Sequence, residues 1–168
     1  PVTEDTPFRP TSVYGATKAA SDLVLMAYRD EYDIDVIGLR YSSVYGPRRA
    51  TDCAIRTMIE DAMAKRPTKL DWGAGEFWPF VYVTDIVTAT AAALDAPKTP
   101  QYAYNVAGPD MPAVQRIAEL VYDFFPNADI ELGSNPRHDK RGRFDLSAAA
   151  RDLTWTPEWD IERGVSAY

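Results

Sequence analysis

Tyr14 and Lys18 lie four positions apart, a spacing that could place their side chains together for proton transfer. A phenol and an ammonium at positions i and i+4 share one face of a helix. A free tyrosine has a pKa of roughly 10, so it acts as an acid or base near neutrality only where a positive charge stabilises the tyrosinate. Lys18 can supply that charge. The same spacing also arises where a tyrosine packs and a lysine is solvated, so the pair alone does not establish a catalytic site.

The pair falls within a segment whose pattern predicts a long helix. Ser12 is a suitable N-cap, because its side-chain oxygen can accept a hydrogen bond from a free backbone amide. Apolar residues then recur at helical spacing as far as about Glu31. The preceding residues 1–10 are rich in proline, threonine and acidic residues, which predicts a surface loop.

Short apolar runs alternate with amphipathic stretches along the rest of the chain. The runs predict strands at residues 34–41, 68–71, 80–83, 102–106 and 128–132. The amphipathic stretches predict helices at residues 53–65, 86–94, 113–125, 146–153 and 161–167. Thr84 or Asp85 can cap the second of these helices, and residues 45–47 have the composition of a turn. Strands that alternate with helices indicate an α/β fold with a largely parallel sheet.

The composition argues against several classes of function. The 168 residues are 46% hydrophobic, which suffices for one sizeable core. A net charge of -7 repels phosphate backbones and anionic lipid, so nucleic acid is not expected as a partner. No apolar run approaches the roughly 20 residues that cross a bilayer, so no membrane association is expected. Cys53 and His138 are the only residues of their types, which predicts no disulfide, no metal site and a reducing, cytoplasmic setting.

Five segments, in order, resemble the extended short-chain dehydrogenases/reductases, the family of NAD-dependent nucleotide-sugar epimerases and dehydratases. The segment PTSVYGATK (residues 10–18) resembles the catalytic segment of that family. The others are LRYSSVYGPR (39–48), FVYVTD (80–85), YNVAG (104–108) and DLSAAARDLTWTP (145–157). The resemblance spans nearly the whole chain, and its specificity comes from the ordered set.

The resemblance implies roles for particular side chains. Tyr14 would be the catalytic acid/base that exchanges a proton with a substrate hydroxyl or carbonyl while hydride moves to or from the nicotinamide. Lys18 would stabilise the tyrosinate and hydrogen-bond the nicotinamide ribose. Tyr41 and the adjoining backbone up to Ser43 would approach the nicotinamide. For Arg40 we expect instead a structural pairing at a strand end.

Substrate binding is assigned to Ser43, Trp78 and Arg137. Relatives that bind nucleotide diphosphates often have asparagine at the position of Ser43 and arginine near Trp78, so both changes would remove polar groups from a diphosphate site. Arg137 matches, by its place in NPRHD (135–139), an arginine that binds phosphate in such relatives, although it could also be a solvated charge. Trp78 could stack on a base or sugar, or cover the core of a small domain.

The implied fold is the C-terminal part of a Rossmann-type parallel sheet plus a small α/β substrate-binding domain. Residues 1–66 would be the remainder of the Rossmann domain, and residues 67–168 mainly the substrate-binding subdomain, with 80–96 returning to the Rossmann part. The sequence contains no Gly-rich turn through which backbone amides could approach a pyrophosphate. Residues 73–75 carry two glycines but precede no helix, which predicts a surface loop. We therefore expect an incomplete chain that is inactive by itself.

Three functions follow as hypotheses. The first is an NAD-dependent epimerase or dehydratase that acts on a nucleotide-activated sugar through a transient keto intermediate, with NAD or alternatively NADP retained. The second, favoured by Ser43 and Trp78, is an NAD(P)-dependent dehydrogenase/reductase of a small hydroxy compound. The third is a non-catalytic dinucleotide sensor, which the presence of both Tyr14 and Lys18 disfavours. A homodimer is expected through the helix that carries Tyr14, because its apolar residues cover more than one face.

Overall fold

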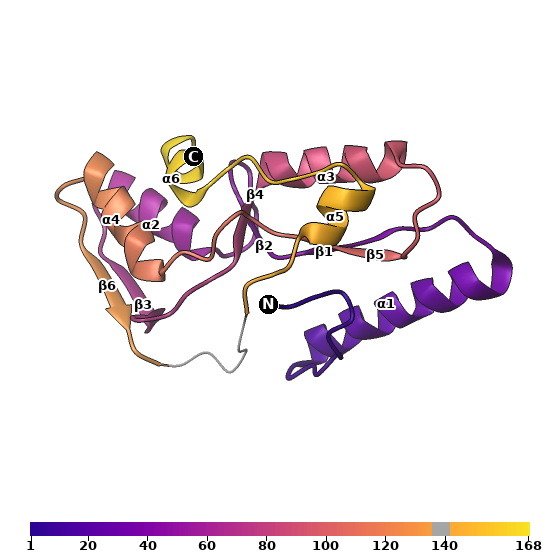
Figure 1. Ribbon diagram of the computed structural model, residues 1–168. Helices are drawn as coiled ribbons and strands as arrows, with labels where there is room; N and C mark the ends of the chain where they lie inside the picture. Colours follow the sequence, from indigo (N-terminus) through magenta and orange to yellow (C-terminus); the bar gives the residue numbers. More distant parts are fainter. Residues whose placement is uncertain (136–141) are drawn as a thin grey trace.

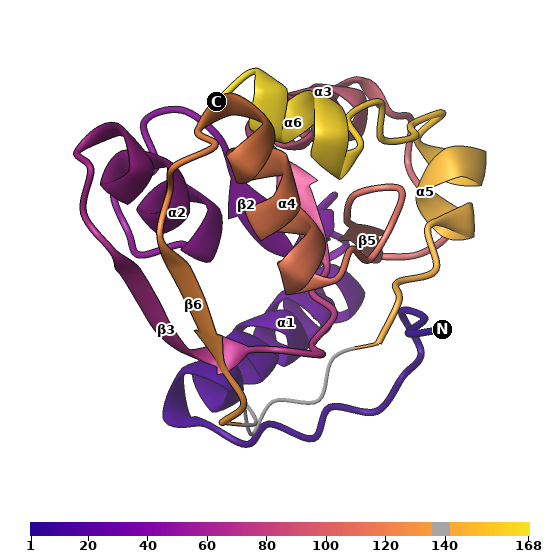
Figure 2. The same ribbon diagram turned by 90° about the vertical axis from the view of Figure 1, so that its left-hand side faces the viewer.

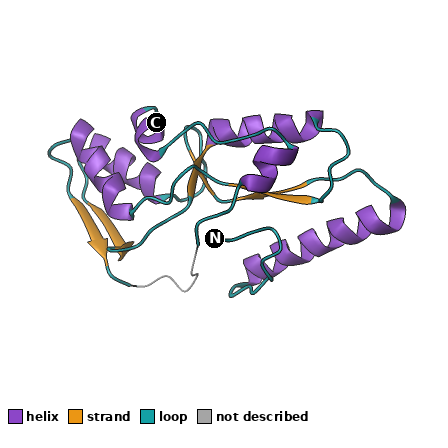
Figure 3. Cartoon of the chain, in the orientation of Figure 1, coloured by secondary structure: helices purple, strands orange, loops and turns teal. Residues whose placement is uncertain are grey.

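The computed structural model describes residues 1–135 and 142–168, which form an α/β fold with parallel strands (Figures 1 and 3). The elements are α1 (Val13–Tyr32), β1 (Gly38–Tyr41), β2 (Ser43–Tyr45), α2 (Ala54–Met63), β3 (Thr68–Gly73), β4 (Phe80–Tyr82), α3 (Val83–Asp95), β5 (Ala103–Val106), α4 (Val114–Phe124), β6 (Ile130–Gly133), α5 (Ser147–Asp152) and α6 (Ile161–Ser166). The strands pair in parallel, β1 with β5, β2 with β4 and β3 with β6. The predicted fold class is confirmed.

Two clusters of buried apolar side chains lie toward opposite ends of the molecule. One is formed largely by α2, α4 and α6 with β4, and includes Ile55, Met58 and Ile117. The other lies between β5, α3 and α5, and includes Ala89 and Tyr104. Figure 1 shows α2 and α4 beside β3 and β6, with α6 next to α4 and β4, whereas α3 and α5 lie over β1 and β5.

Helix α1 stands apart from both clusters. Ser12 caps it as predicted, accepting a hydrogen bond from the Gly15 backbone amide at 3.0 Å. Figures 1 and 2 show α1 on the opposite side of the β1–β5 pair from α3. None of the 20 residues of α1 is buried. Its larger exposed apolar side chains are Val13, Tyr14, Leu23, Val24, Leu25, Tyr28 and Tyr32.

Among the described residues, no helix has the length and apolar character that a membrane crossing requires.

Two strand predictions need correction. The strand predicted at residues 34–41 contains only Gly38–Tyr41, because its partner β5 begins at Ala103, opposite Gly38. A second strand, β2, follows after one residue and extends to Tyr45, where the sequence predicted a turn. The rest of the predicted turn is present and begins at Gly46, whose φ is 135°. Pairing with β4 stabilises β2, and a local sequence pattern carries no information about that distant partner.

Asp85 does not cap α3, contrary to the prediction, and neither does Thr84. The helix begins at Val83, and the Asp85 carboxylate accepts hydrogen bonds from the backbone amides of Glu158 at 3.0 Å and Trp159 at 3.1 Å. Asp85 is 1% exposed, and burial raises the pKa of its carboxyl even though the two amides act in the opposite direction. These bonds attach the segment between α5 and α6 to α3. This segment joins the cluster that contains α5 to the cluster that contains α6.

The N-terminal loop lies along the outer edge of β5. The backbone amide of Asn105 donates to the Glu4 carboxylate at 2.8 Å, and the Asn105 side-chain amide donates to the Val2 carbonyl at 3.1 Å. Val2 also forms an isolated parallel bridge with Phe144. The predicted surface loop is therefore mostly exposed, yet it supplies an acceptor to a strand edge.

Replacing Asp85 with alanine should lower the free energy of unfolding by about 2–4 kcal/mol, because two backbone amides lose their acceptor in a buried setting. Chemical denaturation followed by circular dichroism measures the change. Asp123→Ala, on the exposed part of α4, is the control and should alter stability by less than about 0.5 kcal/mol. Equal stability of the two variants would mean that packing alone holds the segment.

Candidate functional site

A cleft of about 640 Å³ opens between the start of α1 and the carboxyl ends of β1 and β2. Its lining comes from Tyr14, residues 41–49, Thr51 and Val83. Ligands of open α/β sheets bind at the carboxyl ends of the strands, and the volume is that of a small-molecule site. The structure thus brings Tyr14, Tyr41 and Ser43 to one cleft.

Tyr14 and Lys18 lie on the same face of α1. Tyr14 is 72% exposed, and the Lys18 ammonium lies 5.4 Å from the centroid of its ring. This proximity follows from the i, i+4 spacing within a regular helix. The structure therefore places the two residues side by side on an exposed face of α1.

Tyr41 is held at the wall of the cleft by Thr90 of α3. The two hydroxyl oxygens are 2.8 Å apart, and the Thr90 hydroxyl donates to the Ile86 carbonyl at 2.7 Å. Because Thr90 has a single hydrogen to donate, the Tyr41 hydroxyl is the donor in their bond. Sequence reasoning did not identify Thr90, because α3 comes to β1 from a distant part of the chain and no local pattern connects them.

Tyr45 also lines the cleft, but its environment keeps it neutral. It is 2% exposed, and burial raises the pKa of its phenol above the ordinary value. Its hydroxyl donates to the Asp160 carbonyl at 3.4 Å, and its ring packs edge-on against Phe80 and Tyr82. Of the three tyrosines at the cleft, Tyr14 has the exposure and the neighbouring cation that suit an acid/base.

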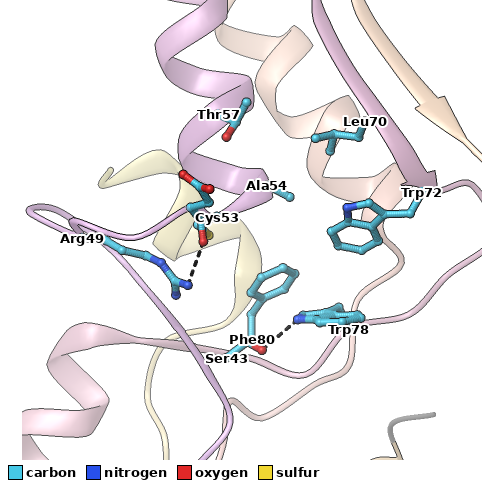
Figure 4. A pocket seen from close by; sticks show the side chains of 10 residues that line it. Ser43, Arg49, Cys53, Ala54, Thr57, Leu70, Trp72, Trp78 and Phe80 are labelled. Carbon is cyan, nitrogen blue, oxygen red and sulfur yellow. Dashed lines mark hydrogen bonds between the residues drawn. The ribbon is translucent and has the colours of Figure 1, made fainter. Parts of the chain in front are cut away.

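A smaller pocket of about 280 Å³ adjoins the cleft at Ser43 (Figure 4). Two indoles line it, Trp72 from β3 and Trp78 from the loop before β4, with ring centroids 5.0 Å apart. Trp78 Nε1 donates to Ser43 Oγ at 2.8 Å, as the dashed line in Figure 4 shows. Trp78 is 6% exposed and belongs to the α2–α4–α6 cluster, whereas its neighbour Phe77 is exposed. Trp78 therefore both covers the core and lines the pocket.

Two arginines follow β2, and sequence reasoning assigned neither of them to the site. Arg49 donates to the carbonyls of Thr51 at 3.2 Å, Asp52 at 2.9 Å and Val44, so its guanidinium holds the loop together. Arg48 is exposed, has a left-handed φ of 68°, and forms no hydrogen bond or ion pair within the described residues. Their local sequence signal is a basic pair after a glycine-proline turn, which a solvated loop would also show, although Arg48 is also the last residue of the 39–48 segment.

Arg40 has the structural pairing that we expected. Its guanidinium contacts the Asp22 carboxylate at 2.7 Å and donates to the Tyr102 hydroxyl at 3.0 Å, which joins α1 to the β1–β5 pair.

Arg137 and His138 lie outside the described residues. Within the described ranges, no group of three or more His, Cys, Asp or Glu side chains could hold a metal ion.

The sequence matches a family model described as the NAD dependent epimerase/dehydratase family over residues 1–107. A dTDP-glucose 4,6-dehydratase of Xanthomonas campestris pv. campestris is 28% identical over 98% of this chain and 50% of its own length. An uncharacterized UDP-glucose epimerase of Bacillus subtilis is 28% identical over 98% of this chain and 53% of its own length. The chain therefore spans about half the length of the curated relatives that it matches.

Solved structures extend the similarity to three dimensions. The UDP-glucuronic acid 4-epimerase of Bacillus cereus, in complex with UDP-glucuronic acid and NAD, superposes with a TM-score of 0.86 at 27% identity, covering 99% of this chain and 54% of the other. The dTDP-glucose 4,6-dehydratase of Bacillus anthracis, in complex with NAD, gives a TM-score of 0.87 at 26% identity, covering 99% and 53%. The arrangement of Figure 1 thus recurs in about half of each of these proteins.

The Tyr41–Thr90 bond should appear as a coupling energy in a double-mutant cycle. Tyr41→Phe and Thr90→Val each remove the bond, so their combined effect on unfolding should fall short of the sum by about 0.5–1.5 kcal/mol. Denaturant titrations of the four proteins give this value. Thr90→Ser keeps the hydroxyl and should retain most of the coupling; strict additivity of Tyr41→Phe and Thr90→Val would contradict the assignment.

Proposed function

The chain belongs to the NAD-dependent epimerase/dehydratase family, and we propose that it is part of an enzyme that epimerises or dehydrates a nucleotide-activated sugar through a transient keto intermediate. One observation carries this proposal. Among the three tyrosines at the cleft, Tyr41 and Tyr45 donate their hydroxyl hydrogens to Thr90 and Asp160, whereas the Tyr14 hydroxyl has no partner within the described residues. Tyr14 is thus the phenol that can exchange a proton with a substrate.

We assign the acid/base role to Tyr14 and the stabilisation of its charged form to Lys18. The family's cofactor is NAD, which supplies the hydride chemistry when bound. The residues present fit its nicotinamide end, because Tyr14 and Tyr41 line one cleft and the Lys18 ammonium can donate hydrogen bonds to ribose hydroxyl oxygens. Tyr41, Ser42 and Ser43 would form the opposite wall.

Substrate recognition is proposed for the adjoining pocket. Ser43 would contact the sugar where cleft and pocket meet, and Trp78 would offer its ring to an apolar face of the substrate. Arg137 stays a proposed phosphate ligand from its resemblance alone. We also propose that residues 1–66 are the Rossmann part and 67–168 mainly the substrate-binding part, with 80–96 returning to the former.

We also propose that the protein forms a homodimer and is located in the cytoplasm. The exposed apolar side chains of α1, which include Leu23, Val24 and Tyr28, favour an association between two copies through this helix. Cys53 is buried and has no second cysteine to pair with, which suits a reducing compartment.

A second candidate function is an NAD(P)-dependent dehydrogenase/reductase of a small hydroxy compound. The observation that favours it is the bond between Ser43 and Trp78, since the polar atoms of these two side chains contact each other. A pocket with indole walls suits a compact substrate that carries no diphosphate.

Tyr14→Phe should lower turnover by about 100- to 10,000-fold, because general acid/base catalysis contributes that factor. The assay uses the protein extended upstream to include a Gly-rich loop, with calorimetry of NAD binding alongside. Tyr32→Phe, at an exposed tyrosine near the far end of the same helix, is the matched control and should retain full turnover. Undiminished turnover by Tyr14→Phe would refute the assignment, whereas NAD binding without turnover of any sugar nucleotide or hydroxy compound would indicate a sensor.

The oxidation state of the cofactor separates the two enzymatic candidates. An epimerase or dehydratase returns the nicotinamide to its starting state, so its near-ultraviolet absorbance should be the same before and after complete conversion of the substrate. A dehydrogenase or reductase would change that absorbance by one cofactor for each substrate converted. A stoichiometric change would therefore replace the first candidate with the second.

A further inference from the structure

We propose that Arg48 is a substrate-binding residue that selects an anionic group, a carboxylate or a phosphate, at the cleft that contains Tyr14. This inference rests on the proposed function, because it specifies what the same cleft recognises. Arg48 is the last residue of the 39–48 segment, to which neither the resemblance nor the acid/base chemistry gave a role.

The cleft has a charge opposite to that of the protein. The chain has a net charge of -7, yet none of the described residues lining the cleft is Asp or Glu. The charged residues among them are Arg48 and Arg49. A concave site lined by one sign of charge concentrates ligands of the other sign. The local field thus favours an anion.

Arg49 is unsuited to bind that anion. Each of its three guanidinium nitrogens donates to a backbone carbonyl, those of Thr51, Asp52 and Val44. A further donor to the Arg49 carbonyl comes from Arg56. Breaking these bonds would release the loop that follows β2. Arg49 therefore positions the loop, and the charge available to a ligand is that of its neighbour.

Arg48 has the donors and the placement that an anion requires. Its guanidinium carries five N–H donors in a fixed fork, which fits a carboxylate or phosphate, and none of them is engaged by another described residue. It shares the cleft with Tyr14, so one substrate can contact both. In the adjoining pocket, the cation among the described lining residues is again Arg49.

The backbone holds Arg48 in a conformation that arginine adopts at a cost. Its φ of 68° lies in the left-handed region, where residues other than glycine are uncommon. The turn is set by Gly46, where a Cβ would lie 2.6 Å from Val83 Cγ1, and by the carbonyl bonds of Arg49. The surrounding loop thus fixes the backbone of Arg48 at the cleft that this residue lines.

Two substitutions separate the charge of Arg48 from its backbone conformation. Arg48→Asn removes the charge and tolerates a left-handed φ, whereas Arg48→Lys keeps the charge and loses the fork. Lys65→Asn is the matched control, because Lys65 is also exposed with a positive φ of 54° and lines neither space. The measurement is calorimetric binding of UDP-glucuronic acid, UDP-glucose and glucuronate to the upstream-extended protein.

Arg48→Asn should weaken binding by about 10- to 100-fold, the loss expected for a charge-assisted hydrogen bond, and Arg48→Lys by less. A loss confined to UDP-glucuronic acid and glucuronate identifies the anion as a carboxylate. Equal losses for both UDP-sugars, with glucuronate unaffected, identify it as the diphosphate. Affinities equal to those of Lys65→Asn for every probe, or no binding of any probe by the unmodified protein, would overturn the inference. Failure of the proposed function is read separately, from turnover by Tyr14→Phe.

Discussion

The Asp85 carboxylate binds the backbone amides of Glu158 and Trp159, and the rest of the molecule depends on this contact. Burying a carboxylate is costly, and the raised pKa of Asp85 shows that two amides only partly offset that cost. In return, the segment after α5 is fixed between the two apolar clusters. Trp159 then stacks on Tyr82, with ring centroids 4.3 Å apart, and Tyr82 packs against Tyr45 at the wall of the cleft. The site therefore rests on a contact far from its own chemistry.

The cleft combines two tyrosines whose hydroxyl groups are hydrogen-bonded to neighbouring segments with one, Tyr14, on a helix that has no buried residue. Tyr41 and Tyr45 lie on short strands. The Tyr41 hydroxyl is hydrogen-bonded to Thr90 of α3, and the Tyr45 hydroxyl is hydrogen-bonded to the carbonyl of Asp160, the residue before α6. Tyr14 stands on α1, which reaches the rest of the described chain through polar contacts such as Arg29 with the Thr99 carbonyl and Asp22 with Arg40. Polar contacts of this kind give direction but bury little apolar area. The position of Tyr14 is thus set by a few directional bonds.

Sequence reasoning recovered what depends on local pattern and lost what depends on distant contacts. The cap at Ser12, the face shared by Tyr14 and Lys18, and the alternation of strands and helices follow from periodicity and capping chemistry, and the structure has them. The strand β2, the use of Asp85, and the bond from Tyr41 to Thr90 each need a partner that the topology brings from elsewhere. Arg48 and Arg49 are adjacent and chemically alike, so only the carbonyls around them distinguish a loop tie from an available cation.

The hydrogen bond from the backbone amide of Asn105 to the Glu4 carboxylate also affects the tendency of the protein to aggregate. An uncovered strand edge is a template to which a strand of another chain can add, and such growth leads to aggregates. The N-terminal loop occupies that edge of β5 with a charged side chain rather than with another strand. Loss of the Glu4 contact would uncover that edge, so the loop protects β5 against sheet extension as well as leading into α1.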